Sequence, residues 1–231
     1  MKPELITIAK SYDDSFKLIR KGKYSFDDLP DYIQNDPDYQ KFKTAVQEGT
    51  FSDSARKEVK DFLSPTSEMK FIDLGCCLNL MFKGYADWVS LYHGVDISKE
   101  AIQLLNEFSA HKNVTVGSLF CGSIHETPFD DNYFDIGACI GVLEYFKKDF
   151  IKETILEIFR ITKHNARFVL DVPDIQNPIR RIMYLIEGHL GRPTEFNMSL
   201  QEFELAIQPY FIIERKDHLD VALIQYFLIR K

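Results

Sequence analysis

The sequence predicts an α/β fold: a doubly wound, mostly parallel seven-stranded sheet with an antiparallel C-terminal hairpin and an N-terminal helical cap. Three observations predict it. Between Met69 and Pro173, short apolar runs alternate with amphipathic stretches, as in successive right-handed βαβ units. Two further strand-like runs follow one another closely near the C-terminal end. Residues 1–64 contain no strand pattern and favour helices.

Seven apolar runs account for the strands. Because helices cover both faces of a parallel sheet, its strands form continuous apolar runs rather than alternating ones. Such runs predict parallel strands over residues 70–75, 89–95, 114–121, 134–140 and 167–172. The last two runs, residues 210–215 and 222–230, are joined by a short turn. We therefore expect them to pair as an antiparallel hairpin at the edge of the sheet.

The chain divides into two parts at the point where the pattern changes. We expect a helical cap or lid over residues 1–64 and an α/β domain over residues 65–231, with a helical insertion at about 175–208. Apolar periodicity predicts helices over residues 52–63, 98–110 and 150–161. Ser98 is expected to cap the second of these helices, and Pro65 follows the first.

Composition narrows the range of partners. The 231-residue chain has a formal net charge of −7 and no long cluster of basic residues, which argues against nucleic acid as a partner. We expect no membrane association and no secretory signal, since no apolar run approaches the roughly 20 residues that span a bilayer. The four cysteines (Cys76, Cys77, Cys121 and Cys139) lack metal-ligand spacing and suit reduced thiols. These features predict a cytoplasmic monomer or homodimer that acts on a small molecule.

A candidate ligand site follows from the order of the strands. In an open parallel sheet, ligands bind beyond the carboxyl ends of the strands, next to the first strand. Gly75 follows that strand and allows a ligand to approach the backbone closely. Asp96 ends the second strand 21 residues later, which is the position of an acid that binds ribose hydroxyls. The pair predicts a nucleoside site.

Four short motifs occur in a fixed order around this pair. They are FIDLGC at 71–76, GVDIS at 94–98, PFDDNYFD at 128–135 and GVLEY at 141–145. Together they resemble the successive motifs of class I, Rossmann-like S-adenosylmethionine-dependent methyltransferases of the small-molecule type. The resemblance covers about residues 70–173. It implies transfer of a methyl group from S-adenosylmethionine to an O, N, S or C atom of a small-molecule acceptor, with S-adenosylhomocysteine as product.

The resemblance also implies a set of cofactor-binding residues in the loops after the first four strands. They are Asp73, Gly75, Cys76, Cys77, Asp96, Ile97, Ser123, Ile124, Cys139, Ile140 and Tyr145. By this resemblance, Asp73 would orient the first loop or reach the amino end of the methionine, and Asp96 would bind both ribose hydroxyls. Ser123 stands where the family usually has an Asp for the adenine amino group. Cys139 and Ile140 would lie under the methionine part.

The glycine loop departs from the family pattern. The usual Gly-x-Gly-x-Gly is Gly75-Cys76-Cys77-Leu78-Asn79 here. Cys77 adds a side chain where the ligand normally meets bare backbone, and Asn79 is the non-glycine residue best suited to a positive φ. This departure leaves a second hypothesis open, a methyltransferase-like binding or scaffold protein without turnover. The same loop and the terminal hairpin argue against a third, a nicotinamide dehydrogenase.

The sequence indicates fewer residues for the acceptor pocket than for the cofactor. Tyr145 would lie near the transferable methyl group, and His189 falls in the insertion expected to shape the acceptor pocket. Both are candidates for a general base, which an amine or thiolate acceptor would not need. The aromatic residues of the cap, among them Tyr12, Tyr32 and Tyr39, either close over the substrate or pack within the cap. No metal site is expected.

Overall fold

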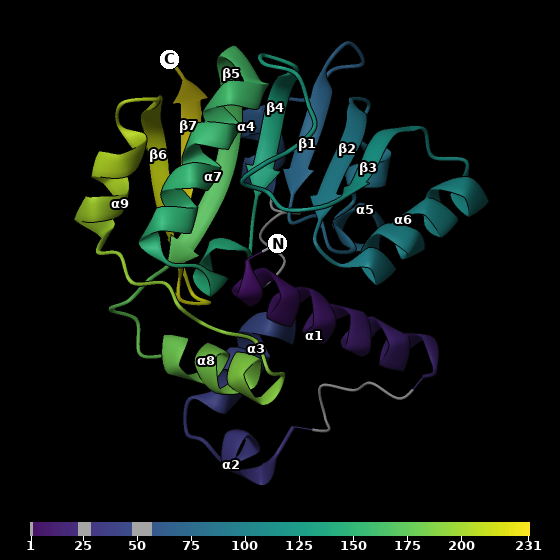
Figure 1. Cartoon of the computed structure of the whole chain (residues 1–231). Coiled ribbons are helices and arrows are strands. Elements are labelled where there is room, and N and C mark those ends of the chain that lie inside the picture. Colours follow the sequence, from purple (N-terminus) through teal and green to yellow (C-terminus); the bar gives the residue numbers. More distant parts are fainter. Residues whose placement is uncertain (1, 23–28, 48–56) are drawn as a thin grey trace.

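The computed structural model describes residues 2–22, 29–47 and 57–231. Its centre is a seven-stranded sheet in the order β3-β2-β1-β4-β5-β7-β6 (Figure 1). The strands are β1 (Lys70–Leu74), β2 (Leu91–Asp96), β3 (Val116–Cys121), β4 (Phe134–Cys139), β5 (Thr162–Pro173), β6 (Phe211–Leu219) and β7 (Leu223–Arg230). Strands β1 to β5 pair in parallel, and β7 pairs antiparallel with both β5 and β6. The predicted doubly wound fold with a C-terminal hairpin is confirmed.

Helices surround the sheet and extend beyond one end of it. They are α1 (Pro3–Arg20), α2 (Asp31–Gln34), α3 (Tyr39–Gln47), α4 (Lys57–Leu63), α5 (Asn79–Phe82), α6 (Lys99–Lys112), α7 (Lys148–Ile161), α8 (Arg180–His189) and α9 (Leu200–Ile207), with short 3-10 turns η3 (Tyr85–Asp87) and η4 (Leu143–Tyr145). Within the described part of the chain, no helix is long and apolar enough to cross a membrane.

Alternation along the strands divides the core into two layers. Ile72 and Phe168 pack in one buried cluster with side chains of α7 and α9. Phe71 and Val169, their neighbours in sequence, pack in the other with side chains of α4, α5 and α6. Because successive side chains of a strand point to opposite faces, each strand contributes to both layers. Both faces of the sheet are therefore covered, as the apolar runs predicted.

Strand β5 is longer than the sequence predicted. It begins at Thr162, directly after α7, whereas the apolar run begins near Arg167. The intervening residues Lys163, His164 and Asn165 are polar and mostly outside the core. They nevertheless continue the strand, because Thr162 pairs with Phe134 at the start of β4. Tertiary pairing here extends a strand over residues whose side chains carry no strand pattern.

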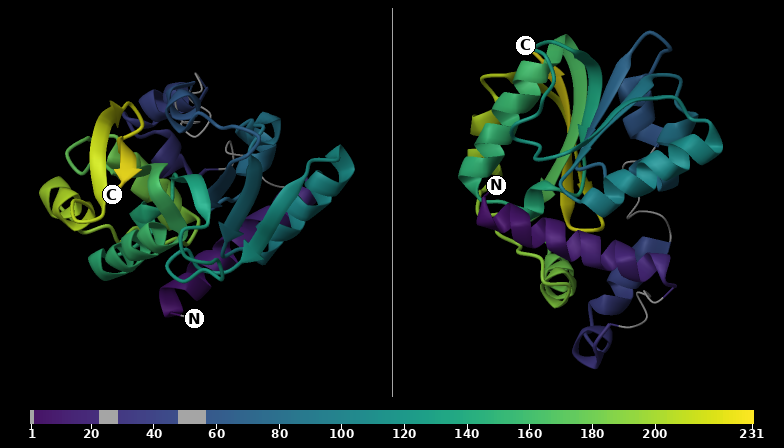
Figure 2. Two further views of the ribbon diagram at one scale, coloured as in Figure 1. Left: turned by 90° about the horizontal axis from the view of Figure 1, so that it is seen from above. Right: turned by 45° about the vertical axis from the view of Figure 1, so that its right-hand side comes forward.

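Two helices of the predicted insertion separate in space. Helix α9 belongs to the layer that covers the sheet. Helix α8 lies beyond the carboxyl ends of the strands, where its Ile182 and Ile186 pack against Ile33 of α2 and Phe42 of α3. Figure 1 shows α1 crossing the same end of the sheet above α8, and Figure 2 shows the same arrangement from a second direction.

Helix α4 lies apart from these cap helices. Its Val59 and Leu63 are fully buried in the sheet cluster that contains Phe71. The expected start of this helix at Ser52–Asp53–Ser54 falls outside the described residues, as do the aromatic residues Tyr24, Phe26 and Phe51. Helix α6 agrees with its prediction: the Ser98 hydroxyl accepts the N–H of Ala101, and the helix ends at Asn113, which has φ +54°.

Candidate functional site

A cavity of about 250 Å³ lies at the carboxyl ends of the central strands, where the strand order reverses next to β1. Loops that follow β1, β2, β3 and β4 form most of its wall, and helix α1 closes one side. Eight of the predicted site residues line it: Gly75, Cys77, Asp96, Ile97, Ser123, Ile124, Ile140 and Tyr145. The fold thus brings together most of the predicted site from four separate loops.

The loop after β1 reverses the chain through two positive φ angles. Gly75 has φ +75°, and a Cβ placed there would lie 2.3 Å from Cγ2 of Val142, so only glycine fits. The N–H groups of Gly75 and Cys76 both donate to the carbonyl of Val95, at 2.8 and 2.9 Å. Cys77 has φ +42°, an unusual conformation for a residue with a side chain.

The expectation that Asn79 adopts a positive φ is wrong. Asn79 is the first residue of helix α5, and Cys77 takes the positive φ two residues earlier. The Asn79 side chain instead donates to the carboxylate of Asp73, at 3.1 Å to the nearer oxygen. The loop enters its helix earlier than a Gly-x-Gly-x-Gly pattern suggests, because this side-chain bond fixes the helix start.

Asp73 is fully buried and does not line the cavity. Besides Asn79, it accepts the hydroxyl of Tyr92 at 2.9 Å. Burial raises the pKa of Asp73 to about 7, although both hydrogen bonds favour the carboxylate. Its hydrogen bond with Asn79 joins the end of β1 to the start of α5.

Asp96 ends β2 with its carboxylate in the cavity wall, 8% exposed. One oxygen accepts the N–H of Cys77 and the other accepts the N–H of Ser98, each at 2.7 Å. Burial raises the pKa of Asp96 to about 6, while these backbone bonds lower it. Since a carboxylate oxygen accepts more than one hydrogen bond, each oxygen retains capacity for a ligand hydroxyl.

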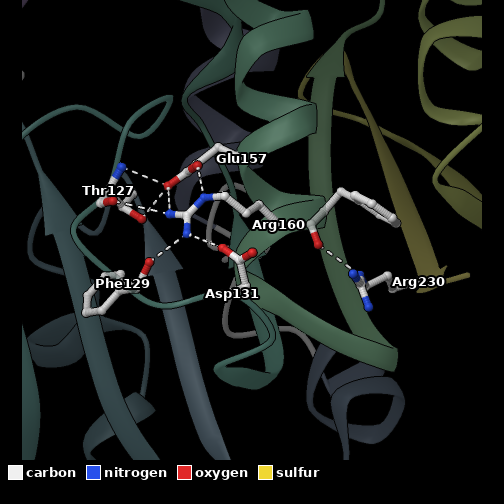
Figure 3. Close-up of polar contacts among 7 residues, drawn as sticks. Thr127, Phe129, Asp131, Glu157, Arg160 and Arg230 are labelled. Carbon is white, nitrogen blue, oxygen red and sulfur yellow. Dashed lines mark hydrogen bonds and ion pairs between the residues drawn. The ribbon is translucent and has the colours of Figure 1, made fainter.

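The loop after β3 brings Ser123 and Ile124 to the cavity. The Ser123 hydroxyl and Nδ1 of His125 are 2.6 Å apart, so His125 holds the serine in place. Further along, Arg160 of α7 fastens the same loop (Figure 3). Its guanidinium donates to the carbonyl of Phe129 at 2.8 Å and also contacts Thr127, Asp131 and Glu157.

Tyr145 and Tyr12 meet in the wall of the cavity. Their hydroxyl oxygens are 2.9 Å apart, and Tyr145 also donates to Glu187 of α8 at 3.1 Å. Arg192 pairs with Glu187 at 3.2 Å and lies 3.8 Å from the ring centre of Tyr12. Burial raises the pKa of both tyrosines, so their hydroxyls stay protonated at neutral pH. Tyr12 therefore lines the cavity and does not pack only within the cap.

Two buried acids in the cavity wall escaped the sequence analysis. Glu144 lies in η4 and Asp171 near the end of β5. Glu144 precedes Tyr145 within the GVLEY motif, so its position was available from the sequence. Asp171 interrupts the otherwise apolar second half of its strand, which is itself a sign of a functional carboxylate because burying a charge is costly.

Several predicted residues lie away from the cavity. Cys76 and Cys139 are fully buried in the two core clusters. His189 is exposed at the end of α8 and is not a lining residue. In the cap, Tyr32 is 59% exposed and Tyr39 packs in the cluster of α2, α3 and α8. Among the described residues, no group of three or more His, Cys, Asp or Glu side chains has the arrangement of a metal site.

A doubly wound sheet with a glycine turn after β1 and a buried aspartate at the end of β2 defines the Rossmann-like, nucleoside-binding class. Within this class, residues 72–170 match a family model described as a methyltransferase domain. This part of the chain therefore resembles a methyltransferase domain, in agreement with the family resemblance expected from the four motifs, and the sheet has the fold of the class I, Rossmann-like methyltransferases.

Individual relatives agree with this assignment. An uncharacterized methyltransferase of Bacillus subtilis, YcgJ, is 26% identical over 126 residues, which are 54% of this chain and 48% of that protein. The chain spans about half the length of the curated relatives it matches.

Solved structures show the same fold. Geranyl diphosphate C-methyltransferase from Streptomyces coelicolor A3(2) superposes with a TM-score of 0.70 at 14% identity, covering 100% of this chain and 99% of the other. Magnesium protoporphyrin IX methyltransferase from Synechocystis PCC 6803 gives a TM-score of 0.67 at 14% identity, covering 98% and 99%. The similarity extends over the cap as well as the sheet.

Proposed function

We propose that this protein is an enzyme that transfers a methyl group from S-adenosylmethionine to a small-molecule acceptor. The observation that carries the proposal is the carboxylate of Asp96, which lines the cavity within the methyltransferase domain. Two backbone N–H groups fix its orientation while leaving both oxygens able to accept further hydrogen bonds. The related methyltransferase structures bind S-adenosylmethionine or its product S-adenosylhomocysteine, in agreement with this choice of cofactor.

The cavity wall fits the two halves of this cofactor. Asp96 would accept hydrogen bonds from the ribose hydroxyls, and the apolar side chains of Ile97 and Ile124 suit the adenine ring. Ser123 would offer its hydroxyl to the adenine amino group. Gly75 and Ile140 would lie along the methionine part, where glycine permits close approach of the backbone.

When bound, the cofactor supplies an electrophilic methyl group on a sulfonium. The chain's own contribution is to align the acceptor with that methyl group and to exclude water, effects that together lower a barrier by up to about 7–11 kcal/mol. Helix α1 is placed to do this, since Tyr12, Leu5 and Ile8 all line the cavity. Tyr145, with its protonated hydroxyl, would position the acceptor by hydrogen bonding rather than remove a proton from it.

Binding of S-adenosylhomocysteine, measured by calorimetry, tests the proposal. We expect saturable binding by the wild-type protein, followed by methyl transfer that mass spectrometry detects as a gain of one methylene in candidate acceptors. Absence of saturable binding would instead support the second hypothesis, a binding or scaffold protein without turnover, which the Cys77 side chain in the cavity favours.

The cellular setting is also a proposal. We place the enzyme in the cytoplasm as a monomer or homodimer. All four cysteines are free thiols in the structure, which supports a reducing compartment. Size-exclusion chromatography with light scattering would decide between the two oligomeric states.

A further inference from the structure

We propose, on the basis of the methyltransferase function, that the acceptor is a small molecule with a protonated amine, which binds against the carboxylates of Glu144 and Asp171. Both side chains lie in the wall of the same cavity, Glu144 in η4 after β4 and Asp171 near the carboxyl end of β5. We assign this part of the cavity to the acceptor because Glu144 adjoins Tyr145, whose hydroxyl contacts Tyr12 of α1 and Glu187 of α8, so the helices beyond the sheet border it.

The geometry of Glu144 indicates a missing donor. Its side chain is 7% exposed, and its Oε2 has no hydrogen-bond partner among the described residues. Asp171 is fully buried, with one oxygen accepting the N–H of Gly141 at 2.8 Å. A buried carboxylate oxygen without a donor is unfavourable, and a ligand that donates a hydrogen bond to it would recover that loss.

The charges around Glu144 favour a cationic donor. Burial raises the pKa of Glu144 well above its usual value, and the nearby carboxylate of Asp171 raises it further, followed by that of Glu187. The opposing charge is Arg192, which only partly compensates. An ammonium group placed between Glu144 and Asp171 would offset the repulsion between the two carboxylates, and it would form charge-assisted hydrogen bonds with them.

The same part of the cavity is poorly suited to an anionic acceptor. The guanidinium of Arg192 is occupied by Glu187 at 3.2 Å, by the hydroxyls of Ser11 and Ser15 at 3.2 and 3.3 Å, and by the ring of Tyr12. Lys83 also lines the cavity, but it follows α5 and its charge acts on Asp73 at the end of β1. A phosphate or carboxylate beside Glu144 would therefore meet like charge.

The remaining walls describe the body of the acceptor. Tyr12 and Tyr145 meet edge to face, with ring centres 6.3 Å apart, and Phe146, Met183 and Leu223 add apolar surface. Aromatic faces attract an ammonium group and also pack on apolar groups. The cavity therefore suits an acceptor in which the amine is attached to an apolar or aromatic group.

Three probes of one size separate the charge of the ligand from its shape. The protein, saturated with S-adenosylhomocysteine, is titrated by calorimetry with 2-phenylethylamine, with neutral 2-phenylethanol and with anionic phenylacetate. We expect the amine to bind at least about tenfold more tightly than the alcohol, the gain from one good charge-assisted contact, and phenylacetate not to bind. Equal binding of the amine and the alcohol would overturn the proposal.

Two isosteric variants test whether the preference for the amine arises at Glu144 and Asp171. Glu144→Gln and Asp171→Asn should each reduce the preference for the amine to less than about threefold while keeping the affinity for S-adenosylhomocysteine within about twofold. Glu195→Gln, which removes an exposed carboxylate paired with Lys147, is the matched control and should behave as wild type. Thermal unfolding establishes whether each variant is folded. If a variant does not fold, the titrations of the wild-type protein with the three probes alone decide whether the cavity prefers the amine.

Two other outcomes have distinct meanings. If Glu144→Gln lowers the affinity for S-adenosylhomocysteine about tenfold and leaves the preference for the amine unchanged, the carboxylate binds the amino group of the cofactor. The acceptor proposal would then be wrong. If the wild-type protein does not bind S-adenosylhomocysteine, the proposed function fails instead. The amine titration is then repeated on the protein alone, where a preference for the amine would still support a cation site at Glu144.

Discussion

The backbone N–H of Cys77 donates to Oδ2 of Asp96 at 2.7 Å, and this bond joins the loop after β1 to the end of β2. The two residues are 19 positions apart in the chain, yet they line the same cavity. The other Asp96 oxygen accepts the N–H of Ser98, so a single carboxylate holds the first loop and the entrance of α6 together. Changes at either residue should therefore affect the cofactor site directly.

Asp96→Ala should weaken binding of S-adenosylhomocysteine by about 1–3 kcal/mol, because the ribose would lose its charged acceptor. The measurement is calorimetry, with the fold checked by circular dichroism. Asp14→Ala, which removes an exposed carboxylate on α1, is the control for the change of charge. Unchanged affinity in Asp96→Ala would remove the ribose assignment.

Cys77→Gly should keep or improve both stability and cofactor binding. The φ of +42° at Cys77 costs a residue with a side chain about 1–2 kcal/mol, which glycine avoids, although the greater freedom of glycine in the unfolded chain offsets about half of the gain. Cys77→Ala retains the strain and removes only the thiol, so it is the matched comparison. Gly75→Ala should do the opposite and lose binding, since its Cβ would collide with Val142. A large loss of affinity in Cys77→Gly would mean that the thiol makes useful contacts.

Arg160→Met should destabilise the protein by about 1–3 kcal/mol and weaken cofactor binding as well. Arg160 donates to the carbonyls of Phe129 and Thr127, which belong to the loop that carries Ser123 (Figure 3). Arg160→Lys keeps the charge but not the planar fork, so it should recover only part of the loss. Thermal unfolding and calorimetry measure the two effects. Lower stability with unchanged affinity for the cofactor would show that the loop that carries Ser123 keeps its conformation without the hydrogen bonds of Arg160.

His93 should make the protein less stable as the pH falls from about 6.5 to 4. Burial lowers the pKa of His93 to about 4, and neither ring nitrogen has a hydrogen-bond partner among the described residues. The unfolded chain binds a proton near pH 6.5 while the folded protein does not, so acid favours unfolding, by up to about 3 kcal/mol.

The comparison of wild type with His93→Phe isolates this effect, because Asp73 and Asp96 titrate in both proteins. Their raised pKa values act in the opposite direction and make stability fall as the pH rises towards 7. Denaturant unfolding at several pH values gives the free energies. Parallel curves for the two proteins would contradict the assignment to His93, whose ring contacts Phe129 and Phe134 edge to face.

Helix α1 should be cut more slowly by trypsin once cofactor and acceptor are bound. Its Asp13 accepts the Ser98 hydroxyl at 2.6 Å and the N–H of Glu100 at 3.1 Å, at the start of α6 beside the cofactor site. Ligands that contact Tyr12 and Ser123 should hold the helix in place, as expected of a lid. Asp13→Asn should be cut faster than wild type without ligands. Equal rates of cleavage with and without ligands would show that the cap has only a structural role and is not a lid.

The sequence predicted the sheet well because each strand had its own local evidence. The apolar runs ending at Gly75 and Asp96 placed β1 and β2 within about two residues, and both of these residues line the cavity. The same reasoning failed at Asn79 and at the start of β5. In both places a contact from elsewhere in the fold, with Asp73 and with Phe134 respectively, decides the backbone conformation.

The sequence by itself determined the class of fold and several residues of the loops that line the cavity, since hydrophobic periodicity and short-range spacing are local properties of a chain. The tertiary structure decided which other side chains meet at that cavity. It placed Tyr12 beside Tyr145 and Glu144 beside Asp171, and it left His189 exposed at the end of α8. These relationships join residues from separate helices, strands and turns. They depend on how α1 and α8 pack beyond the sheet, and that packing follows from the total apolar surface buried rather than from any spacing within one segment.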